Sequence, residues 1–517
     1  MIDRSATMAT RSQIVERLRP ASTAWSVNGR EVEFVADFDL GVEPGGLLIV
    51  TTPAGARVLV QVHALTARTH QGVTVDVDTE ELGIDQVHGA RVNLSVRIVE
   101  GSGVVLGALD GGEVVPFDEA GLERADDASI AGYHDRVLGD GAGLEIGTLR
   151  SSTVPARLKA AGFARHTFMC GQSGSGKTFS LGVVLERLLY ETELPVIIVD
   201  PNSDYVNLGK VSPRAAINRF ARTPMTRDEY ATLNTTYPER ADVAVASARH
   251  GDLPLTIHLS DLTLHEQALT MQLDPIADPD QYHALVEATA AFGDASYDVE
   301  DIISSLLGRF DEASRHLAQR IANLGLAEWS VWARSDEPSL VGRGRDHRVL
   351  ILDTGSLATA YERSVVSLAL LGRLRRRPDR SAVSVVIDEA HNVCPPDAGT
   401  RLEQAVTDLA LWIAGEGRKY GIYLLLSTQR PQKIHRNVLS QCDNLLLMRV
   451  NSASDLDELA TVFSHVPASL IAEARAHRMG EMLAAGPIAP TPLRLQMGVR
   501  WTREGGADLP TAWATRP

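Results

Sequence analysis

The chain has 517 residues, of which 44% are hydrophobic and 22% are charged. This is the composition of a folded globular protein, and it excludes a disordered tail, a collagen-like fibre and a low-complexity array. The length predicts about three domains. Acidic residues outnumber basic ones by 66 to 50, for a net charge of −16. We therefore do not expect the whole surface to attract nucleic acid, although a local basic channel stays compatible with a DNA partner.

Three cysteines, Cys170, Cys394 and Cys442, lie far apart in the chain. Neither zinc-ligand spacing nor a redox pair is present, and so sparse a cysteine content suits a reducing compartment. Residues 1–20 lack the apolar core of a signal peptide, and no apolar run approaches the roughly 18 residues of a membrane helix. We expect a cytoplasmic protein with no membrane partner.

The first 140 residues predict a small antiparallel β-barrel. Short alternating segments separated by glycine-containing turns are typical of such barrels. The candidate strands are 31–36, 47–51, 56–62, 73–77 and 91–99. A glycine-rich stretch at 139–143 then predicts a hinge that ends this domain, residues 1–140.

Beyond the hinge, short apolar strands alternate with helices, which predicts a parallel α/β sheet. The first part, 141–210, holds a strand at 166–170, a helix at 179–190 and a strand at 196–199. In the second part, 346–490, the candidate strands are 349–352, 383–387, 422–426 and 445–450.

Between these parts, residues 211–345 predict a mostly helical insertion without strands. Its apolar residues recur at helical spacing. They are Ile302, Leu306 and Phe310, followed by Leu317, Ile321 and Leu324. From 487 on the chain is proline-rich, and we expect an irregular C-terminal arm at 491–517. Either the arm reaches a neighbouring subunit or it is a loose terminus.

The strongest local motif is Gly171-Gln172-Ser173-Gly174-Ser175-Gly176-Lys177-Thr178, which fits G-x-x-x-x-G-K-[ST]. Lysine occurs only five times in the chain, so a chance match is improbable. Such a loop holds phosphates with backbone N–H groups and a helix N-terminus. It predicts that ATP and Mg²⁺ bind here, with the lysine on the β- and γ-phosphates and the Thr178 hydroxyl on Mg²⁺. The predicted nucleotide-binding residues are Gly171, Ser173, Gly174, Ser175, Gly176, Lys177, Thr178 and Phe179. The alternative is a glycine-rich connector with an incidental lysine.

The second motif is Asp388-Glu389, directly after the apolar strand 383–387. An ATPase needs one carboxylate in the Mg²⁺ shell and one that polarises the attacking water. We assign Asp388 to the metal and Glu389 to the water. Considered alone, an Asp-Glu pair after a strand is a weak signal, because such pairs often cap the next helix. For His391 two readings stay open, a relay to the site or a cap of the following loop.

A third candidate follows the strand 422–426. Gln429 lies at the tip of this strand and is expected to sense the γ-phosphate. Ser427 and Thr428 alternatively act as helix N-caps, and both readings are compatible.

Basic residues gather in two places. Arg418 and Lys419 precede the strand 422–426. Arg418 is a candidate arginine finger for a neighbouring subunit, with Lys419 as the fallback, although spacing alone favours an exposed helix end placed by the helix dipole. A second basic run extends over 373–380, where a solvated helix end is the ordinary interpretation and a DNA contact the alternative.

Taken together, the motifs resemble the HerA/FtsK group of P-loop ATPases, and most closely its HerA branch, over about 144–497. Beside the P-loop, the resemblance depends on motifs along the core. They are Ile146-Gly147, Ser151-Ser152, Val154-Pro155, Arg165-His166, Asp200-Pro201, Asp204-Tyr205, Leu352-Asp353 to Leu357, Asp388-Glu389-Ala390-His391, Gly417-Arg418-Lys419-Tyr420-Gly421 and Thr428-Gln429-Arg430-Pro431.

This resemblance implies an α/β RecA-like P-loop ATPase core with a helical insertion and an N-terminal small β-barrel. It further implies a homo-hexameric ring that moves along DNA using ATP, with Lys177 and Gln429 in catalytic roles and Arg418 as a finger in trans. Asn202-Ser203-Asp204 departs from the His-Gly-Glu-like run common in the group, which leaves the role of Asp204 open.

Relatives in this group work with a nuclease in DNA end processing or with effector enzymes in phage defence. The sequence has no recognisable nuclease motif, so a separate chain would supply cleavage. The alternatives are an ATP-binding ring scaffold that activates a partner effector and a motor for secretion or conjugation. Candidate DNA contacts are Arg401, Arg430 and Lys433. We expect the barrel to dock the partner enzyme, or otherwise to stabilise the ring.

Overall fold

The computed structural model describes residues 22–77, 90–150, 152–219, 221–334, 337–340 and 346–505. These residues form two compact units. Unit 1 contains the chain up to Gly139 together with Leu149–Val154 and Pro467–Leu470, and unit 2 contains the remainder. The chain therefore passes from one unit to the other inside the glycine-rich stretch 139–143.

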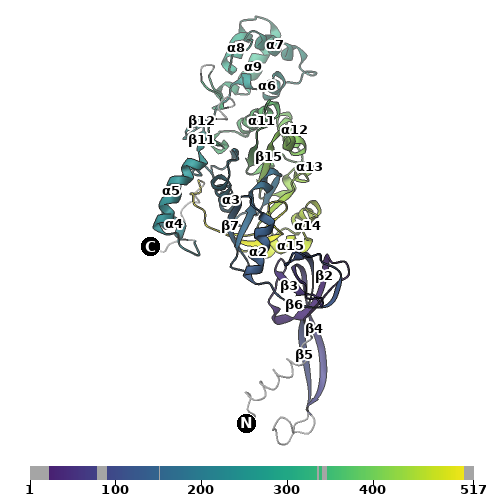
Figure 1. Cartoon of the computed structure of the whole chain (residues 1–517). Helices are drawn as coiled ribbons and strands as arrows, with labels where there is room; N and C mark the ends of the chain where they lie inside the picture. The colour runs from purple at the N-terminus through teal and green to yellow at the C-terminus, as the bar shows by residue number, and fades with distance from the viewer. Residues whose placement is uncertain are drawn as a thin grey trace, which may run out of the picture. The chain divides into compact units, whose positions relative to one another are not determined.

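Unit 1 is built on a closed antiparallel barrel, which confirms the predicted barrel. Its strands follow the order β1-β2-β5-β4-β3-β6, and β4 and β5 pair far beyond the barrel as a long ribbon (Figure 1). The strands are β1 (Thr23–Ser26), β2 (Glu31–Asp37), β3 (Leu47–Thr51), β4 (Arg57–Val77), β5 (Ala90–Ala108) and β6 (Phe117–Arg124), followed by helix α2 (Asp127–Leu138). The predicted segments 56–62 and 73–77 are one strand, and β1 and β6 were missed because they are short or largely polar.

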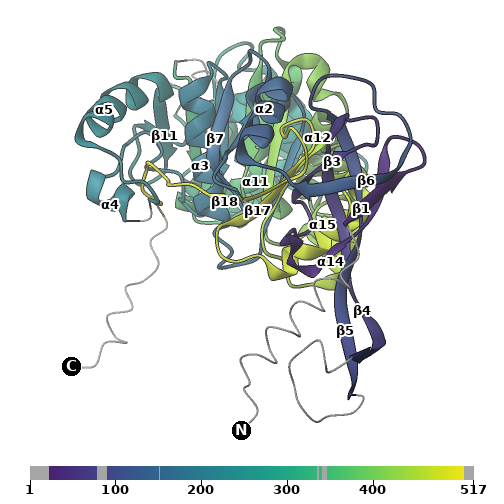
Figure 2. The same ribbon diagram turned by 60° about the horizontal axis from the view of Figure 1, so that its bottom comes forward.

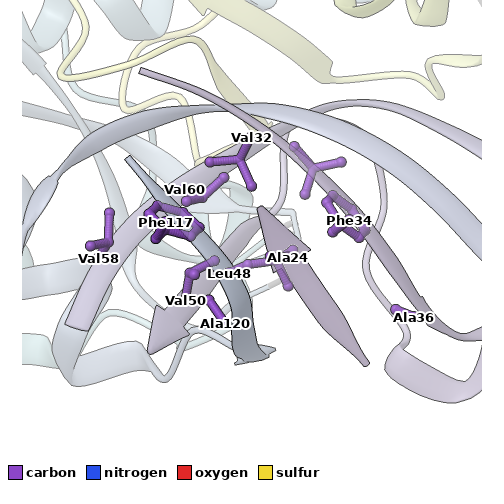
Figure 3. Packing of buried hydrophobic residues seen from close by; sticks show 11 residues of the cluster. Ala24, Val32, Phe34, Ala36, Leu48, Val50, Val58, Val60, Phe117 and Ala120 are labelled. Carbon is purple, nitrogen blue, oxygen red and sulfur yellow. The ribbon is translucent and has the colours of Figure 1, made fainter. Parts of the chain in front are cut away.

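The core of the barrel is aliphatic with two aromatic rings (Figure 3). Along β2 every second residue is buried, which places Val32, Phe34 and Ala36 inside. At Gly101, on the neighbouring strand β5, a Cβ would lie 2.2 Å from the Phe34 ring. A glycine is therefore required where this ring crosses the strand.

Unit 2 contains a sheet of 12 strands in the order β12-β11-β13-β10-β14-β15-β9-β16-β17-β18-β7-β8. The pairs from β12 to β16 are parallel, whereas β17 pairs antiparallel with β16 and with β18. The strands are β7 (Gly143–Leu149), β8 (Pro155–Lys159), β9 (Thr167–Cys170), β10 (Val196–Asp200), β11 (Val243–Ser247), β12 (Leu253–Pro254), β13 (Val349–Asp353), β14 (Val383–Ile387), β15 (Ile422–Thr428), β16 (Asn444–Leu447), β17 (Glu481–Ala485) and β18 (Leu493–Met497).

Helices cover this sheet in pairs, α3 against α5 and α11 against α12 (Figure 2). The helices outside the insertion are α3 (Lys177–Glu191), α11 (Ala360–Arg376), α12 (Arg401–Glu416), α13 (Arg436–Leu439), α14 (Ala453–Val462) and α15 (Ala468–Ala472). None of the helices in the described ranges is both long and apolar enough to cross a bilayer.

The segment predicted as a mostly helical insertion without strands contains helices and also two strands. Its helices are α4 (Arg214–Asn218), α5 (Arg227–Ala241), α6 (Leu264–Thr270), α7 (Pro279–Ala290), α8 (Val299–Leu307) and α9 (Glu312–Asn323), of which α6 to α9 form a cluster in Figure 1. The segment also contributes β11 and β12 to the sheet, which corrects the prediction that it lacks strands. Periodicity missed β11 because it is five residues long and alternates valine with alanine.

Two further predictions about helices and termini are wrong. Phe310 does not continue the apolar face of Ile302 and Leu306, because α8 ends at Leu307 and the Phe310 side chain is 94% exposed. The region from 487 on is not irregular, since β18 pairs with β17 over four residues. The described part of the predicted arm, up to 505, belongs to unit 2, and 506–517 lie outside the described residues.

Candidate nucleotide-binding site

Four neighbouring parallel strands, β10, β14, β15 and β9, end at one edge of the sheet. The P-loop follows β9, Asp388 and Glu389 follow β14, and Gln429 follows β15. Ligands of open parallel sheets bind outside the carboxyl ends of the strands. The topology therefore brings these three predicted motifs to the same place.

The P-loop is shaped by glycines in the left-handed region. Gly174 has a φ of 73° and Gly176, which caps α3, has a φ of 91°. L side chains rarely adopt this backbone conformation, so the loop depends on glycine at both positions. Helix α3 starts at Lys177, which places its partially positive N-terminus at the loop.

Lys177 lies at the centre of a buried polar cluster. Its Nζ donates to Asp388 Oδ1 at 2.6 Å and to Ser427 Oγ at 2.9 Å. Ser427 Oγ in turn donates to the same carboxylate oxygen at 2.7 Å. Ser427 is thus a site residue and not the helix N-cap considered from the sequence, because the next short helix, η8 (Pro431–Lys433), has no side-chain cap.

This cluster contains more negative than positive side chains, with Asp388 and Glu389 beside the single Lys177. Burial by itself lowers the pKa of Lys177, but attraction by Asp388 and Glu389 outweighs it, and the pKa of the lysine is raised. The lysine is therefore a permanent cation beside two carboxylates. The net negative charge that remains suits a divalent cation.

Glu389 is held by three neighbours. Its Oε1 accepts from Gln429 Nε2 at 2.9 Å, its Oε2 lies 3.2 Å from His391 Nδ1, and its Oε1 lies 3.6 Å from Lys177 Nζ. Desolvation raises the pKa of Glu389, yet these neighbours together lower it to about 2. The backbone of Glu389 also has a φ of 45°, a strained conformation for a non-glycine residue. Such strain persists only where the surroundings enforce it, as they do at functional sites.

His391 and Gln429 both contact the catalytic edge. His391 Nδ1 lies 3.1 Å from Thr428 Oγ1 as well as close to Glu389, so its ring bridges the ends of β14 and β15. This geometry agrees with the relay reading of His391. Gln429 is held in place by its hydrogen bond to Glu389.

The residues present fit Mg²⁺. Asp388 Oδ2 is buried and has no hydrogen-bond partner among the described residues, so one oxygen of this carboxylate remains for a ligand. The Thr178 hydroxyl follows directly after Lys177 at the start of α3. Among the described residues no cluster of three or more metal-ligating side chains occurs, and Mg²⁺ at phosphate sites commonly takes only one or two protein ligands.

Two further carboxylates lie at this edge: Asp200, to which the sequence assigns no role, and Asp204, whose role the sequence leaves open. Desolvation raises the pKa of Asp200, at the end of β10, to about 7, and that of Asp204 to about 6. Asp200 accepts hydrogen bonds from the backbone N–H groups of Asp204 and Tyr205, and so orders the loop that follows β10. Only the tertiary neighbours of these groups reveal the shifts.

A cavity of about 940 Å³ opens beside the P-loop. It is lined by Gly176, Lys177 and Thr178, by residues of α4, by the end of β18 and by residues between 498 and 504 that follow it. The sequence offered no signal for the part of this lining that lies in α4 and after β18, because those residues are far from every motif.

Arg418 is the predicted site residue that the structure does not bring to this edge. It lies in η7 (Gly417–Tyr420), before β15, whereas Gln429 follows the other end of that strand. Its guanidinium donates to Asp443 at 2.8 Å, and Lys419 pairs with Glu416 at 2.6 Å. In the basic run, Arg376 pairs with Glu266 at 2.8 Å.

A P-loop beside a strand that ends in Asp-Glu defines a P-loop ATPase that hydrolyses ATP. Its solved structural neighbours include VirB4 of Thermoanaerobacter pseudethanolicus, with a TM-score of 0.47 and 17% identity over 69% of this chain and 97% of that one. Another is the bacterial conjugative coupling protein TrwB, with a TM-score of 0.46 and 13% identity over 74% of this chain and 94% of that one.

Residues 144–328 match the family model "Helicase HerA, central domain". The chain is also 23% identical to the DNA double-strand break repair helicase HerA of Sulfurisphaera tokodaii, over 71% of each protein. It is 24% identical to the protein of that name from Saccharolobus solfataricus, over 74% of this chain and 72% of the relative. These similarities agree with the HerA/FtsK group of P-loop ATPases that the motifs predicted, and the family model covers residues 144–328 of the chain.

Proposed function

We propose that this protein is an ATP-driven DNA translocase or helicase motor that works as a homo-hexameric ring. The observation that supports it best is the fixed, ionised Glu389 beside Lys177 and Asp388. A site that only binds nucleotide needs no carboxylate aimed at water.

We assign each residue of the site a role according to its contacts. Lys177 and the P-loop backbone hold the phosphates of ATP. Thr178 and Asp388 hold Mg²⁺, which supplies positive charge against the β- and γ-phosphates. Glu389 orients and polarises the attacking water, while Gln429 and His391 fix that carboxylate. For Gln429 we propose the further role of a γ-phosphate sensor.

DNA is the proposed track, on the model of the relatives that are named as DNA repair helicases. A chain with a net charge of −16 needs local cations for this purpose. Arg430 and Lys433 are exposed and follow β15 at the nucleotide edge. Arg401, the third candidate, forms an ion pair with Asp274 and is therefore the weakest of the three.

The motor is tested by measuring ATP hydrolysis with and without DNA. We expect DNA to accelerate turnover, and Glu389→Gln to bind ATP while slowing turnover by about 10²–10⁴-fold, the usual contribution of a general base. DNA affinity should fall with salt at a slope of about −0.7 to −0.9 per phosphate contacted. If DNA does not change the rate of ATP hydrolysis and salt does not change the DNA affinity, the proposal of a DNA motor is wrong.

The alternative is a ring scaffold in which ATP binding assembles and activates a partner effector. A scaffold predicts that Glu389→Gln retains full partner activation, because binding alone suffices. A motor predicts that the variant assembles with the partner but does not support DNA processing.

For the barrel we propose docking of a separate nuclease or defence effector. The buried polar side chains among the described residues of the barrel strands and turns are Ser26, Thr52 and Gln61, none of which is an ionisable group, so the part of the barrel that the structure describes shows no buried cluster of titratable residues. A chain lacking residues 1–140 should keep ATP hydrolysis in part and lose partner capture. Partner binding retained by an assembled ring of this shortened chain would contradict docking.

A further inference from the structure

The chain segment after β18, residues 498–504, runs beside helix α3 and lines the cavity next to the P-loop. Gly498, Val499 and Thr502 face this cavity together with Arg503 and Glu504. All of them belong to the same unit as the P-loop. We call residues 498–504 the strap.

A buried carboxylate holds the strap in place. Glu186, in the middle of α3, is fully buried and its carboxylate accepts from the backbone N–H groups of Trp501 at 2.8 Å and Thr502 at 2.7 Å. It also accepts from the Thr502 hydroxyl at 2.7 Å. Three hydrogen bonds to one carboxylate are a strong tether.

Aromatic and guanidinium contacts reinforce this tether. The Arg187 guanidinium lies 3.3 Å from the centre of the Trp501 ring, and Nη2 of the same arginine donates to the carbonyl of Val499 at 2.8 Å. The Arg500 guanidinium lies against α3 where Gly182 leaves room, since a Cβ at Gly182 would lie 2.5 Å from it. The strap is therefore a built part of the site and not a loose terminus.

The strap meets the first turn of α3, directly after the P-loop. Arg500 Nη1 lies 3.4 Å from the carbonyl oxygen of Thr178. Backbone N–H groups of a P-loop hold the α- and β-phosphates at this helix start. A cavity of about 940 Å³ is also much larger than a triphosphate group alone would fill.

We propose that the strap is the nucleoside-binding wall of the ATP site, with Arg503 contacting the nucleoside side of the ligand and Glu186 as the positioning residue that holds the wall. This inference rests on the proposed function of the P-loop. Arg503 suits the role because it lines the cavity, is exposed and has no ion-pair or hydrogen-bond partner among the described residues. Val499, Met497 and Ile217 add apolar surface for a flat base.

The test compares two ligands, ATP and inorganic tripolyphosphate, which lacks a nucleoside. Binding of each is measured by calorimetry on the full chain, for the wild type, Arg503→Ala and Thr502→Val. We expect the variants to weaken ATP by about tenfold, in line with a lost charge-assisted contact. Tripolyphosphate should bind within about twofold of the wild type, and Arg249→Ala, at an exposed arginine away from this cavity, should change neither affinity.

Unchanged ATP affinity in both variants would overturn the proposal, and so would an equal loss for both ligands, because a wall for the nucleoside cannot affect a ligand without one. Failure of the P-loop assignment has a different signature. In that case Lys177→Ala would bind tripolyphosphate as the wild type does.

The positioning role of Glu186 is tested by Glu186→Gln, which keeps the shape of the side chain and removes its charge. We expect a rise in KM for ATP of about tenfold with kcat within twofold, since the strap loosens while Glu389 and Lys177 stay in place. A fall in kcat at unchanged KM would overturn this role.

Discussion

The nucleotide edge of unit 2 and the barrel of unit 1 bury different kinds of side chain: charged ones at the nucleotide edge and apolar ones in the barrel. At the nucleotide edge Lys177, Asp388 and Glu389 are all buried, and each charge is compensated by a neighbour at hydrogen-bond or ion-pair distance. In the barrel the described core is aliphatic and aromatic, and its few buried polar side chains carry no charge. Buried charge is costly unless it is paired, and at the nucleotide-binding residues it is paired.

The comparison teaches where a substitution should change activity and where it should change only stability. A residue at the nucleotide edge contributes through a specific charge and position. A residue in the barrel core contributes through the apolar surface it buries, which any side chain of similar shape supplies.

The largest effect is expected at Lys177. Lys177→Ala removes the cation for the β- and γ-phosphates and leaves Asp388 and Glu389 buried without their partner, so ATP hydrolysis should be abolished. Lys210→Ala, an exposed lysine in the same unit, is the matched control and should hydrolyse ATP normally. Measurable ATP hydrolysis by Lys177→Ala would show that this buried charge is not essential for activity, against the contrast drawn between the two regions.

The next effect concerns Arg418, which lies away from the nucleotide edge of its own chain. If it acts on a neighbouring subunit, Arg418→Ala should lower turnover by about 10³–10⁵-fold. Mixed rings of Arg418→Ala and Glu389→Gln subunits should recover part of the activity, because some interfaces then pair an intact finger with an intact carboxylate.

Lys419→Ala, which removes the fallback candidate, is measured in the same way, and a loss of turnover in that variant alone would assign the finger to Lys419. If verified mixed rings stay inactive, the pairing of Arg418 with Asp443 is a structural ion pair and nothing more.

In the barrel, Leu48→Ala should cost about 2–5 kcal/mol of unfolding free energy in unit 1, because Leu48 is fully buried in the aliphatic core. ATP hydrolysis should stay unchanged. Val27→Ala, at a barrel residue that is 86% exposed, should alter neither quantity. Chemical denaturation followed by tryptophan fluorescence measures the first effect, and a loss of turnover in Leu48→Ala would show that the regions are coupled.

The smallest effect is a pH dependence of stability at the nucleotide edge. Desolvation raises the pKa of Asp200 to about 7 and of Asp204 to about 6, so the folded protein keeps protons that the unfolded chain releases near pH 4. Stability from these groups is therefore present below about pH 4 and falls as the pH rises toward 7. Asp204→Asn should flatten the slope of unfolding free energy between pH 5 and 7, and an unchanged slope in urea titrations would count against the shift.

The sequence by itself determined the class of the protein and most of its core. The P-loop and Asp388-Glu389 are short sequence motifs, and the residue types and their spacing within each motif indicate its chemistry. The strands before them are short apolar runs, which are typical of a buried parallel sheet. Even the barrel followed from alternation alone, because the period of two along β2 is the physical cause of its burial.

The tertiary structure alone decided which residues meet. Ser427 looked like a helix cap and instead bridges Lys177 and Asp388, because β14 and β15 are neighbours in the sheet. The segment around Trp501 looked like an irregular tail and instead lies tethered to Glu186, more than 300 residues earlier in the chain. No local pattern encodes such a pairing, since its free energy arises only when folding brings the two segments together and removes water from the carboxylate.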